Sequence, residues 1–163
     1  MNIIQTHYFN NQIDPYKYSF GWVSPEYHLI SWALSYLQLK KLYGNVAKYC
    51  NSETVILLKN QLDLPSYNYY TSHDDLNIPH EKLWAMPKIF IYSLQKEAFI
   101  DLDGDVFLFG KLPDELLNGS LISQKVEEAT DYYLKTQNEL TGNFNYFPNY
   151  VKNDFESNIP TKL

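Results

Sequence analysis

The sequence contains no arginine, since all 13 of its basic residues are lysine. A phosphate group bound by this chain must therefore be held by lysine, by backbone N–H groups or by a metal ion, without the paired hydrogen bonds of a guanidinium. Acidic residues number 19, and the resulting net charge of −6 argues against a nucleic-acid-binding surface.

Cysteine and long apolar runs are also scarce. Cys50 is the only cysteine, so no disulfide can form within the chain, and a reducing compartment fits. No apolar run reaches the roughly 18 residues of a membrane-spanning helix. The first residues lack a basic region followed by an apolar core, so we expect no signal peptide. Together these absences predict a cytoplasmic protein without a membrane span.

The chain is rich in residues that build a core. Of its 163 residues, 45% are hydrophobic and 17% are aromatic. This is enough for one packed domain and too much for a disordered chain, so we expect a single domain over residues 1–163.

Strand and helix patterns alternate along the chain. Ser24 before Pro25 is typical of a helix start, and Gly44 is typical of a helix end. Pro87 interrupts a helical pattern, so it either kinks that helix or marks its true start. We expect strands over 2–9, 45–49, 67–70 and 98–108, and helices over 25–43, from 52 to about 62, 80–94 and 123–139. This order predicts a three-layer α/β/α domain with a mostly parallel sheet and a ligand site beyond the carboxyl ends of the strands.

The segment over 99–113 is the most informative. Asp101, Asp103 and Asp105 alternate with apolar residues and Gly104 between two apolar stretches. Alternation along a strand would place the three carboxylates on one face. Carboxylates between core segments need compensation, and a divalent cation is the usual one, while a glycine permits a tight turn.

An ordinary turn is the simpler interpretation, because Asp and Gly are common turn residues. An EF-hand calcium loop fits poorly. Counted from Asp101, the sixth position should be glycine but is Val106, and the twelfth should be a carboxylate but is Leu112.

The 99–113 segment resembles the Asp-x-Asp segment of metal-dependent glycosyltransferases of the GT-A type. Further stretches, covering nearly the whole chain, are similar to an uncharacterised bacterial group of glycosyltransferase-like proteins; they span residues 21–25, 31–44, 83–95 and 121–127.

The resemblance implies a Rossmann-like nucleotide-diphospho-sugar transferase fold. It implies that Asp103 and Asp105 hold Mn²⁺ or Mg²⁺, which bridges the diphosphate of a sugar nucleotide, most commonly a UDP-sugar. Lys88 occupies the place of a basic residue near the diphosphate. The first strand and its loop would line the nucleotide pocket, which nominates Gln5, Thr6, His7 and Tyr8.

Structural roles stand beside these functional ones. In the structural interpretation, Lys88 is a solvent-exposed residue of a helix, and His7 caps the end of a strand. Asp101 would support the turn. Trp32 and Trp84 would belong to the core rather than stack on a base, and the Asp74-Asp75 pair would cap a helix or a turn.

Enzymes of the resembled type continue beyond the Asp-x-Asp segment into a half that binds the acceptor. Here the sequence stops at Leu163, so we expect the donor-binding part of such an enzyme, with a second chain or self-association covering the missing half. The alternatives are a catalytically incomplete nucleotide-sugar-binding module and a purely structural acidic turn. The sequence names neither a catalytic base, a donor sugar nor an acceptor.

Overall fold

The computed structural model describes residues 2–9, 14–64, 68–78 and 83–120, with scattered positions from 122 to 149. The chain divides into two units, Met1–Lys111 and Leu112–Leu163. The first unit contains the sheet. In the described part of the second unit, the short helix α4 (Asp114–Leu117) begins directly after Pro113.

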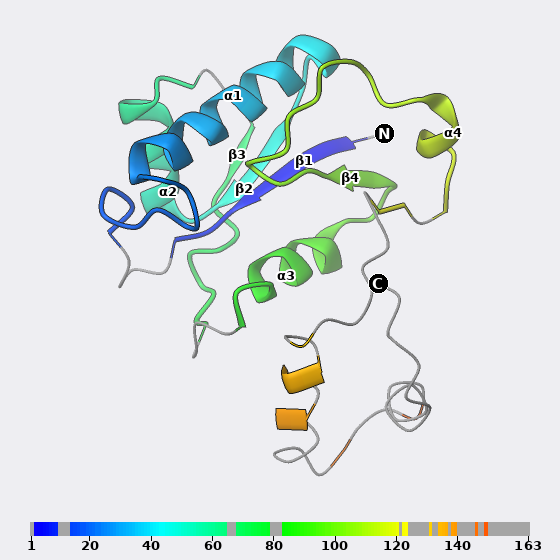
Figure 1. Ribbon diagram of the computed structural model, residues 1–163. Coiled ribbons are helices and arrows are strands. Elements are labelled where there is room, and N and C mark those ends of the chain that lie inside the picture. Colours follow the sequence, from blue (N-terminus) through cyan, green and yellow to red (C-terminus); the bar gives the residue numbers. More distant parts are fainter. Residues whose placement is uncertain are drawn as a thin grey trace. The chain divides into compact units, whose positions relative to one another are not determined.

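The sheet of the first unit is parallel throughout. Its described strands are β1 (Asn2–His7), β2 (Ala47–Cys50), β3 (Tyr69–Tyr70) and β4 (Phe99–Asp101), in the order β3-β2-β1-β4 (Figure 1). The order reverses between β1 and β4, because β2 and β3 lie on one side of β1 and β4 lies on the other. In open parallel sheets, the crevice at the carboxyl ends of two such strands is the usual position for a ligand.

Helices cover both faces of the sheet. Helix α1 (Pro25–Tyr43) and helix α3 (Met86–Leu94) lie on opposite faces (Figure 1). This arrangement confirms the expected α/β architecture. It follows from the connections, since right-handed crossovers in opposite directions along a sheet place their helices on opposite faces.

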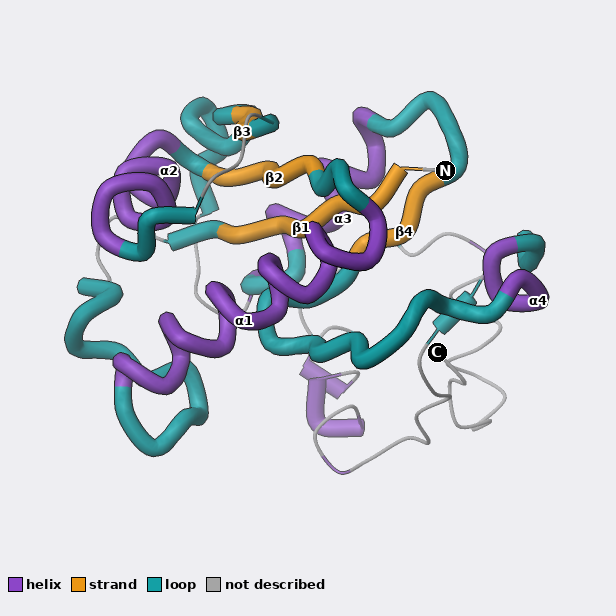
Figure 2. Tube along the Cα trace, turned by 90° about the horizontal axis from the view of Figure 1, so that it is seen from above, coloured by secondary structure: helices purple, strands orange, loops and turns teal. Residues whose placement is uncertain are grey.

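The helix boundaries follow local signals. Helix α1 starts at Pro25 after Ser24 and ends at Gly44, whose φ of 79° favours glycine. Helix α3 has Pro87 in its first turn, so this proline marks the start of the helix. Helix α2 (Ser52–Ile56) continues into the π-helical segment η1 (Leu57–Gln61). Figure 2 shows α2 at the carboxyl end of β2, beside β1.

The expected strand over 98–108 is wrong beyond Asp101, where β4 ends. A turn follows, in which the Val106 N–H donates to the Asp103 carbonyl at 3.0 Å. Ser35 in α1 donates from Oγ to the Val106 carbonyl at 2.6 Å, and this bond directs the segment toward the helix. The three aspartates therefore do not share one strand face.

Some of the expected strands and helices lie partly outside the described residues. The strand expected over 67–70 is observed at Tyr69–Tyr70, and residue 67 lies outside the described residues. Residues 80–82 and most of the helix expected over 123–139 also lie outside them. Among the helices of the described part, none is long and apolar enough to cross a membrane.

Candidate functional site at the carboxyl edge of the sheet

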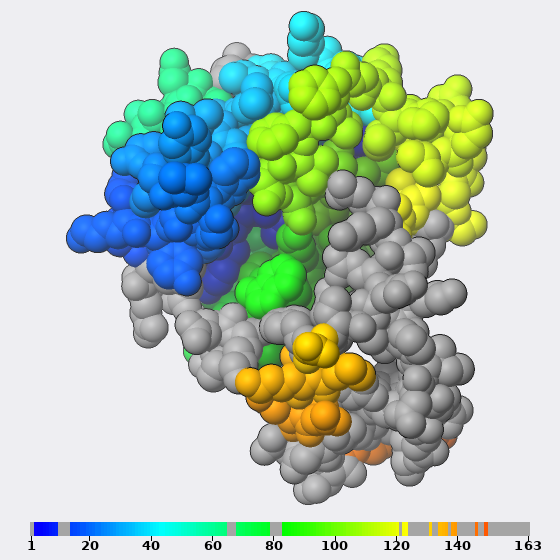
Figure 3. Space-filling view, in the orientation of Figure 1, coloured from blue at the N-terminus to red at the C-terminus, as the bar shows by residue number. Residues whose placement is uncertain are grey.

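Residues 101–106, here called the acidic turn, leave β4 beside the end of β1. The backbone of Gly104 packs against two buried rings. A Cβ at this position would lie 2.6 Å from Trp32 Cδ1 and 2.7 Å from His7 Cε1. Figure 3 shows the yellow-green residues that contain the turn directly beside the blue residues of α1. Glycine is therefore needed here because the protein's own rings approach the backbone.

Two aspartates of the acidic turn lie at the surface. Asp103 forms an ion pair with Lys88 of α3, with 48% and 26% of the respective side chains exposed. The structure thus brings together two of the residues nominated from the sequence. Asp105 is exposed, and its negative charge opposes the burial that lowers the pKa of His28 in α1.

Asp101 supports the turn from within. Its Oδ2 accepts a hydrogen bond of 2.8 Å from the Tyr92 hydroxyl of α3, whereas its Oδ1 is buried and has no hydrogen-bond partner among the described residues. Burial raises the pKa of Asp101, while the Tyr92 hydrogen bond and the charge of Lys88 act in the opposite direction. Asp101 is therefore easier to protonate than an exposed aspartate.

The carboxylates fit a cation that is shared with a ligand. Among the described residues, no three His, Cys, Asp or Glu side chains gather into a possible metal site. Magnesium, however, is commonly held by one or two carboxylates together with waters and substrate phosphates. Asp103 and Asp105 supply two exposed carboxylates, two residues apart in the acidic turn. This set suits a metal–phosphate complex better than a cage built by the protein alone.

The residues nominated in β1 lie mostly in the interior. Gln5, Thr6 and His7 are 0%, 9% and 1% exposed. Gln5 and His7 contact α1, through Ser35 and Trp32 respectively. Thr6 points to the opposite face, because side chains alternate along a strand. Of the four nominated residues, the one that lines a cavity is Tyr8.

Gln5 and His7 belong to a buried polar layer, which we define as Gln5, His7, Ser35 and Lys48. Lys48 Nζ donates to Gln5 Oε1 at 2.9 Å and lies 3.0 Å from His7 Nε2. Gln5 Nε2 in turn donates to Ser35 Oγ at 2.9 Å. Because Ser35 also bonds the carbonyl of Val106, the layer connects β2 with the acidic turn.

Lys48 is 0% exposed and also lies over the ring of Tyr36, at 4.4 Å from its centre. Burial lowers its pKa to about 7. Burial, with a further contribution from Lys48, also holds the pKa of His7 well below its usual value. The sequence reasoning missed Lys48. Its signal was period-two spacing with the apolar residues Val46 and Cys50, which places all three on one face of a strand.

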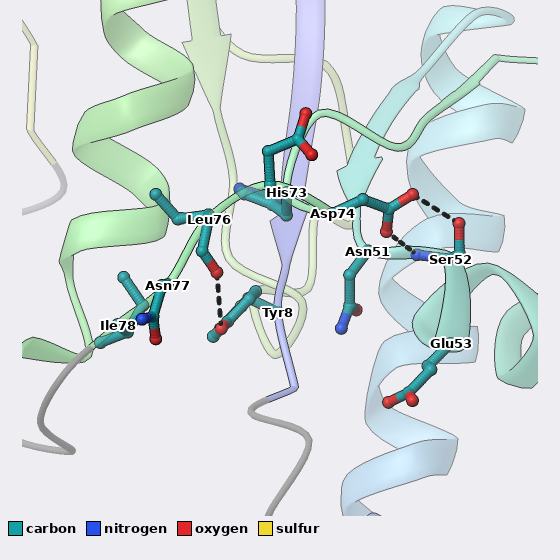
Figure 4. Close-up of a pocket in the computed structure, with 10 residues that line it drawn as sticks. Tyr8, Asn51, Ser52, Glu53, His73, Asp74, Leu76, Asn77 and Ile78 are labelled. Atoms are coloured by element: carbon teal, nitrogen blue, oxygen red, sulfur yellow. Dashed lines mark hydrogen bonds between the residues drawn. The ribbon is translucent and has the colours of Figure 1, made fainter.

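A pocket of about 610 Å³ opens at the carboxyl ends of β1 and β2 (Figure 4). Asp74 accepts hydrogen bonds from the backbone N–H and the hydroxyl of Ser52, both at 2.6 Å, which confirms the capping role expected for it. Tyr8 donates to the Leu76 carbonyl at 3.4 Å. The lining residues are Tyr8, Asn51, Ser52, Glu53, His73, Asp74, Asp75, Leu76, Asn77 and Ile78.

The described lining of the pocket favours an uncharged polar ligand group over an anion. No lysine is among the described lining residues, whereas Glu53 and Asp75 are exposed carboxylates. His73, at 1% exposure, donates from Nε2 to the Pro87 carbonyl at 3.2 Å, and burial lowers its pKa. Since Pro87 precedes Lys88, the wall of the pocket is joined to the residue that pairs with the acidic turn.

The two tryptophans with an expected core role differ. Trp32 is 9% exposed and packs against His7 and Phe9, so its core role is confirmed. Trp84 is 65% exposed, so the same expectation is wrong there. It lies in the turn before α3, where no strand or helix of the described part covers it.

The fold and site define an α/β domain with a parallel sheet, an acidic turn and a polar pocket, both at the carboxyl edge of that sheet. The chain belongs to a family of unknown function, DUF6734, whose profile matches residues 1–162. No curated protein matches the chain. No solved structure matches it either.

Proposed function

We propose that this chain is a metal-dependent glycosyltransferase with a Rossmann-like GT-A fold, or the donor-binding part of one. It binds a sugar nucleotide, with a UDP-sugar the first candidate, and transfers the sugar to an acceptor. One observation carries the proposal. The acidic turn lies at the carboxyl ends of β1 and β4, where the strand order reverses, and ligands of open parallel sheets bind at such a point.

The two halves of a sugar nucleotide match two regions of the edge. The diphosphate needs positive charge, and Lys88 supplies it beside Asp103. The nucleoside carries no charge, and the described lining of the cavity around Tyr8 consists mainly of polar and acidic side chains. The exposed carboxylates of that cavity are suitable acceptors for ribose hydroxyls.

Asp103 and Asp105 would hold the cation, which supplies Lewis-acid stabilisation of the charge that develops on a departing diphosphate. When Asp103 binds the cation, its ion pair with Lys88 must break. The cost is small, because ion pairs at the surface contribute about 0–1 kcal/mol. Lys88 would then be released to donate hydrogen bonds to a phosphate oxygen.

Thermal unfolding with a panel of sugar nucleotides, with and without Mn²⁺, tests the proposal. A ligand at a hundred times its Kd stabilises the native state by about 2.7 kcal/mol, which raises Tm by about 5–10 °C for a chain of this length. We expect this shift only with metal. It should disappear in Asp103→Asn and Asp105→Asn and persist in the control Glu97→Gln, which changes an exposed carboxylate just before β4. An equal shift without metal, or in the Asp103 variant, would contradict the proposal.

A module that binds a sugar nucleotide without transferring the sugar is the second candidate. The burial of His7, Lys48 and His73, each at most 1% exposed, favours it, because none of these bases can reach an acceptor at the surface. Release of free nucleotide from the donor separates the two candidates. Metal-dependent binding with no nucleotide release, in the presence of simple acceptors and of water alone, would support the binding module.

A further inference from the structure

The exposed residues of α1 form a single stripe along its outer face. At 100° per residue they fall within an arc of about 100°. The four in the middle are large and apolar, between 46% and 58% exposed, and the ends carry one acid and one base. The stripe consists of Glu26, Tyr27, Ile30, Leu34, Leu37 and Lys41.

The inner face of α1 is mixed, with Leu29, Trp32 and Leu39 buried beside the polar residues Ser31 and Ser35. The outer face is therefore at least as apolar as the buried one, whereas the exposed face of a surface helix is normally polar. This outer face is blue in Figure 3 and lies on the surface of the molecule. The stripe is therefore a candidate for contact with another protein surface.

We propose that α1 pairs with α1 of a second copy of this chain, antiparallel and about a two-fold axis. The charges at the two ends of the stripe indicate that the partner is a second copy of α1. In the antiparallel arrangement, Glu26 faces the partner's Lys41, and the symmetry repeats the contact at the other end. Leu34 then lies near the axis, and Ile30 packs beside the partner's Leu37. A parallel pairing would bring like charges together.

The exposed apolar residues of α3 lack this complementarity. Its exposed positions, which include Met86, Ile89 and Tyr92, carry no charged side chain. Helix α1 spans 19 residues, or about 27 Å, and one helix pair of that length makes a small interface. The dimer is therefore reversible, and its population depends on protein concentration.

Sedimentation velocity of the full chain tests the pairing, over about 1–300 µM to cover the affinities of small interfaces. Ile30→Glu should raise the dimer Kd at least about 100-fold, because it places a charge in the apolar contact. Ile89→Glu is the matched control, since both isoleucines lie on helices and are similarly exposed, at 58% and 55%. This control should leave Kd unchanged. Far-UV circular dichroism verifies that each variant is folded.

Charge reversal tests the direction of the pairing. Glu26→Lys and Lys41→Glu should each raise the homodimer Kd by about tenfold, because each creates two like-charge contacts. An equimolar mixture of the two variants should dimerise with about the wild-type Kd, since every contact is again between opposite charges. A wild-type chain that stays monomeric over the whole range would overturn the proposal, including the case in which residues 112–163 cover the stripe. Single reversals without effect, or a mixture that fails to restore pairing, would overturn it equally.

Discussion

Because Gly104 packs against two buried rings, we predict that replacing it with alanine lowers the stability of the protein. Alanine at this position places its Cβ 2.6 Å from Trp32 and 2.7 Å from His7. Both rings are buried, at 9% and 1% exposure, so neither can swing into solvent. Overpacking of this kind costs about 1–3 kcal/mol.

Part of that cost is offset, because replacing glycine restricts the unfolded chain and stabilises by about 0.4–1 kcal/mol. From the middle of both ranges, the net loss for Gly104→Ala is about 1.3 kcal/mol, which lowers Tm by about 3–5 °C. Gly110→Ala is the matched control, since a Cβ there meets no atom within 4 Å and neither glycine lies in the left-handed region. It should leave Tm unchanged or raise it slightly.

Both variants can be measured by urea unfolding and by differential scanning calorimetry. If Gly104→Ala unfolds at the same temperature as Gly110→Ala, the close packing of the acidic turn against α1 is wrong. If both variants lose stability equally, the effect belongs to the loop in general and not to the contact with the rings.

Three further predictions concern side chains. Stability should rise from pH 7 to about pH 8.5, by about 1.4 kcal/mol per pH unit, because folding releases the Lys48 proton; urea unfolding of Lys48→Met should show a shallower slope. Ser35→Ala should cost about 1–3 kcal/mol, because it removes the donor to the half-buried Val106 carbonyl and the acceptor of the buried Gln5 amide, and hydrogen exchange in the acidic turn should accelerate. Asp74→Ala should cost about 0.5–2 kcal/mol by removing the bonds to Ser52, whereas Asp74→Asn retains an acceptor and should lose less in chemical unfolding.

The pH prediction has a defined sign and window. In the unfolded chain, Lys48 keeps its proton up to the ordinary pKa of 10.5, whereas in the folded chain its pKa is about 7. The unfolded state thus binds more protons between these values, and stability rises with pH. Burial raises the pKa of Cys50 from 9.0 to about 12, so above pH 9 the Cys50 contribution falls with pH and offsets the Lys48 gain, and the rise in stability levels off. Stability that does not change from pH 7 to 8.5, with the same profile in Lys48→Met, would show that Lys48 keeps its proton in the folded protein.

Local signals predicted the helices well. The Ser24-Pro25 start and the Gly44 end of α1 depend on backbone conformations of a few neighbouring residues, so a single sequence contains the information. The strand at Phe99–Asp101 was expected for the same reason, as the first part of a longer strand over 98–108. The end of that strand at Asp101 was missed, because it depends on the contact of Val106 with Ser35, which is 71 positions away.

The polar character of the interior could not be predicted from pattern alone. Gln5 and His7 were nominated for a ligand because the resemblance to GT-A glycosyltransferases implies that the first strand lines a nucleotide pocket. In the structure they face Lys48 and Ser35 instead. Such choices depend on hydrogen bonds between distant segments, and hydrophobic periodicity contains no information about them.

The pairing of the strands has a consequence for the order of events in folding. The sheet has no hairpin among its described strands, because β1 pairs in parallel with β2 and with β4. Asn2 pairs with Phe99, so the edge of β1 that faces β4 stays unpaired during synthesis until about a hundred further residues have been made. Long-range parallel pairing folds slowly, since loop closure precedes any gain from contacts. The other edge of β1 can pair with β2 earlier, so the edge that faces β4 is the part of the described sheet for which a chaperone would matter most.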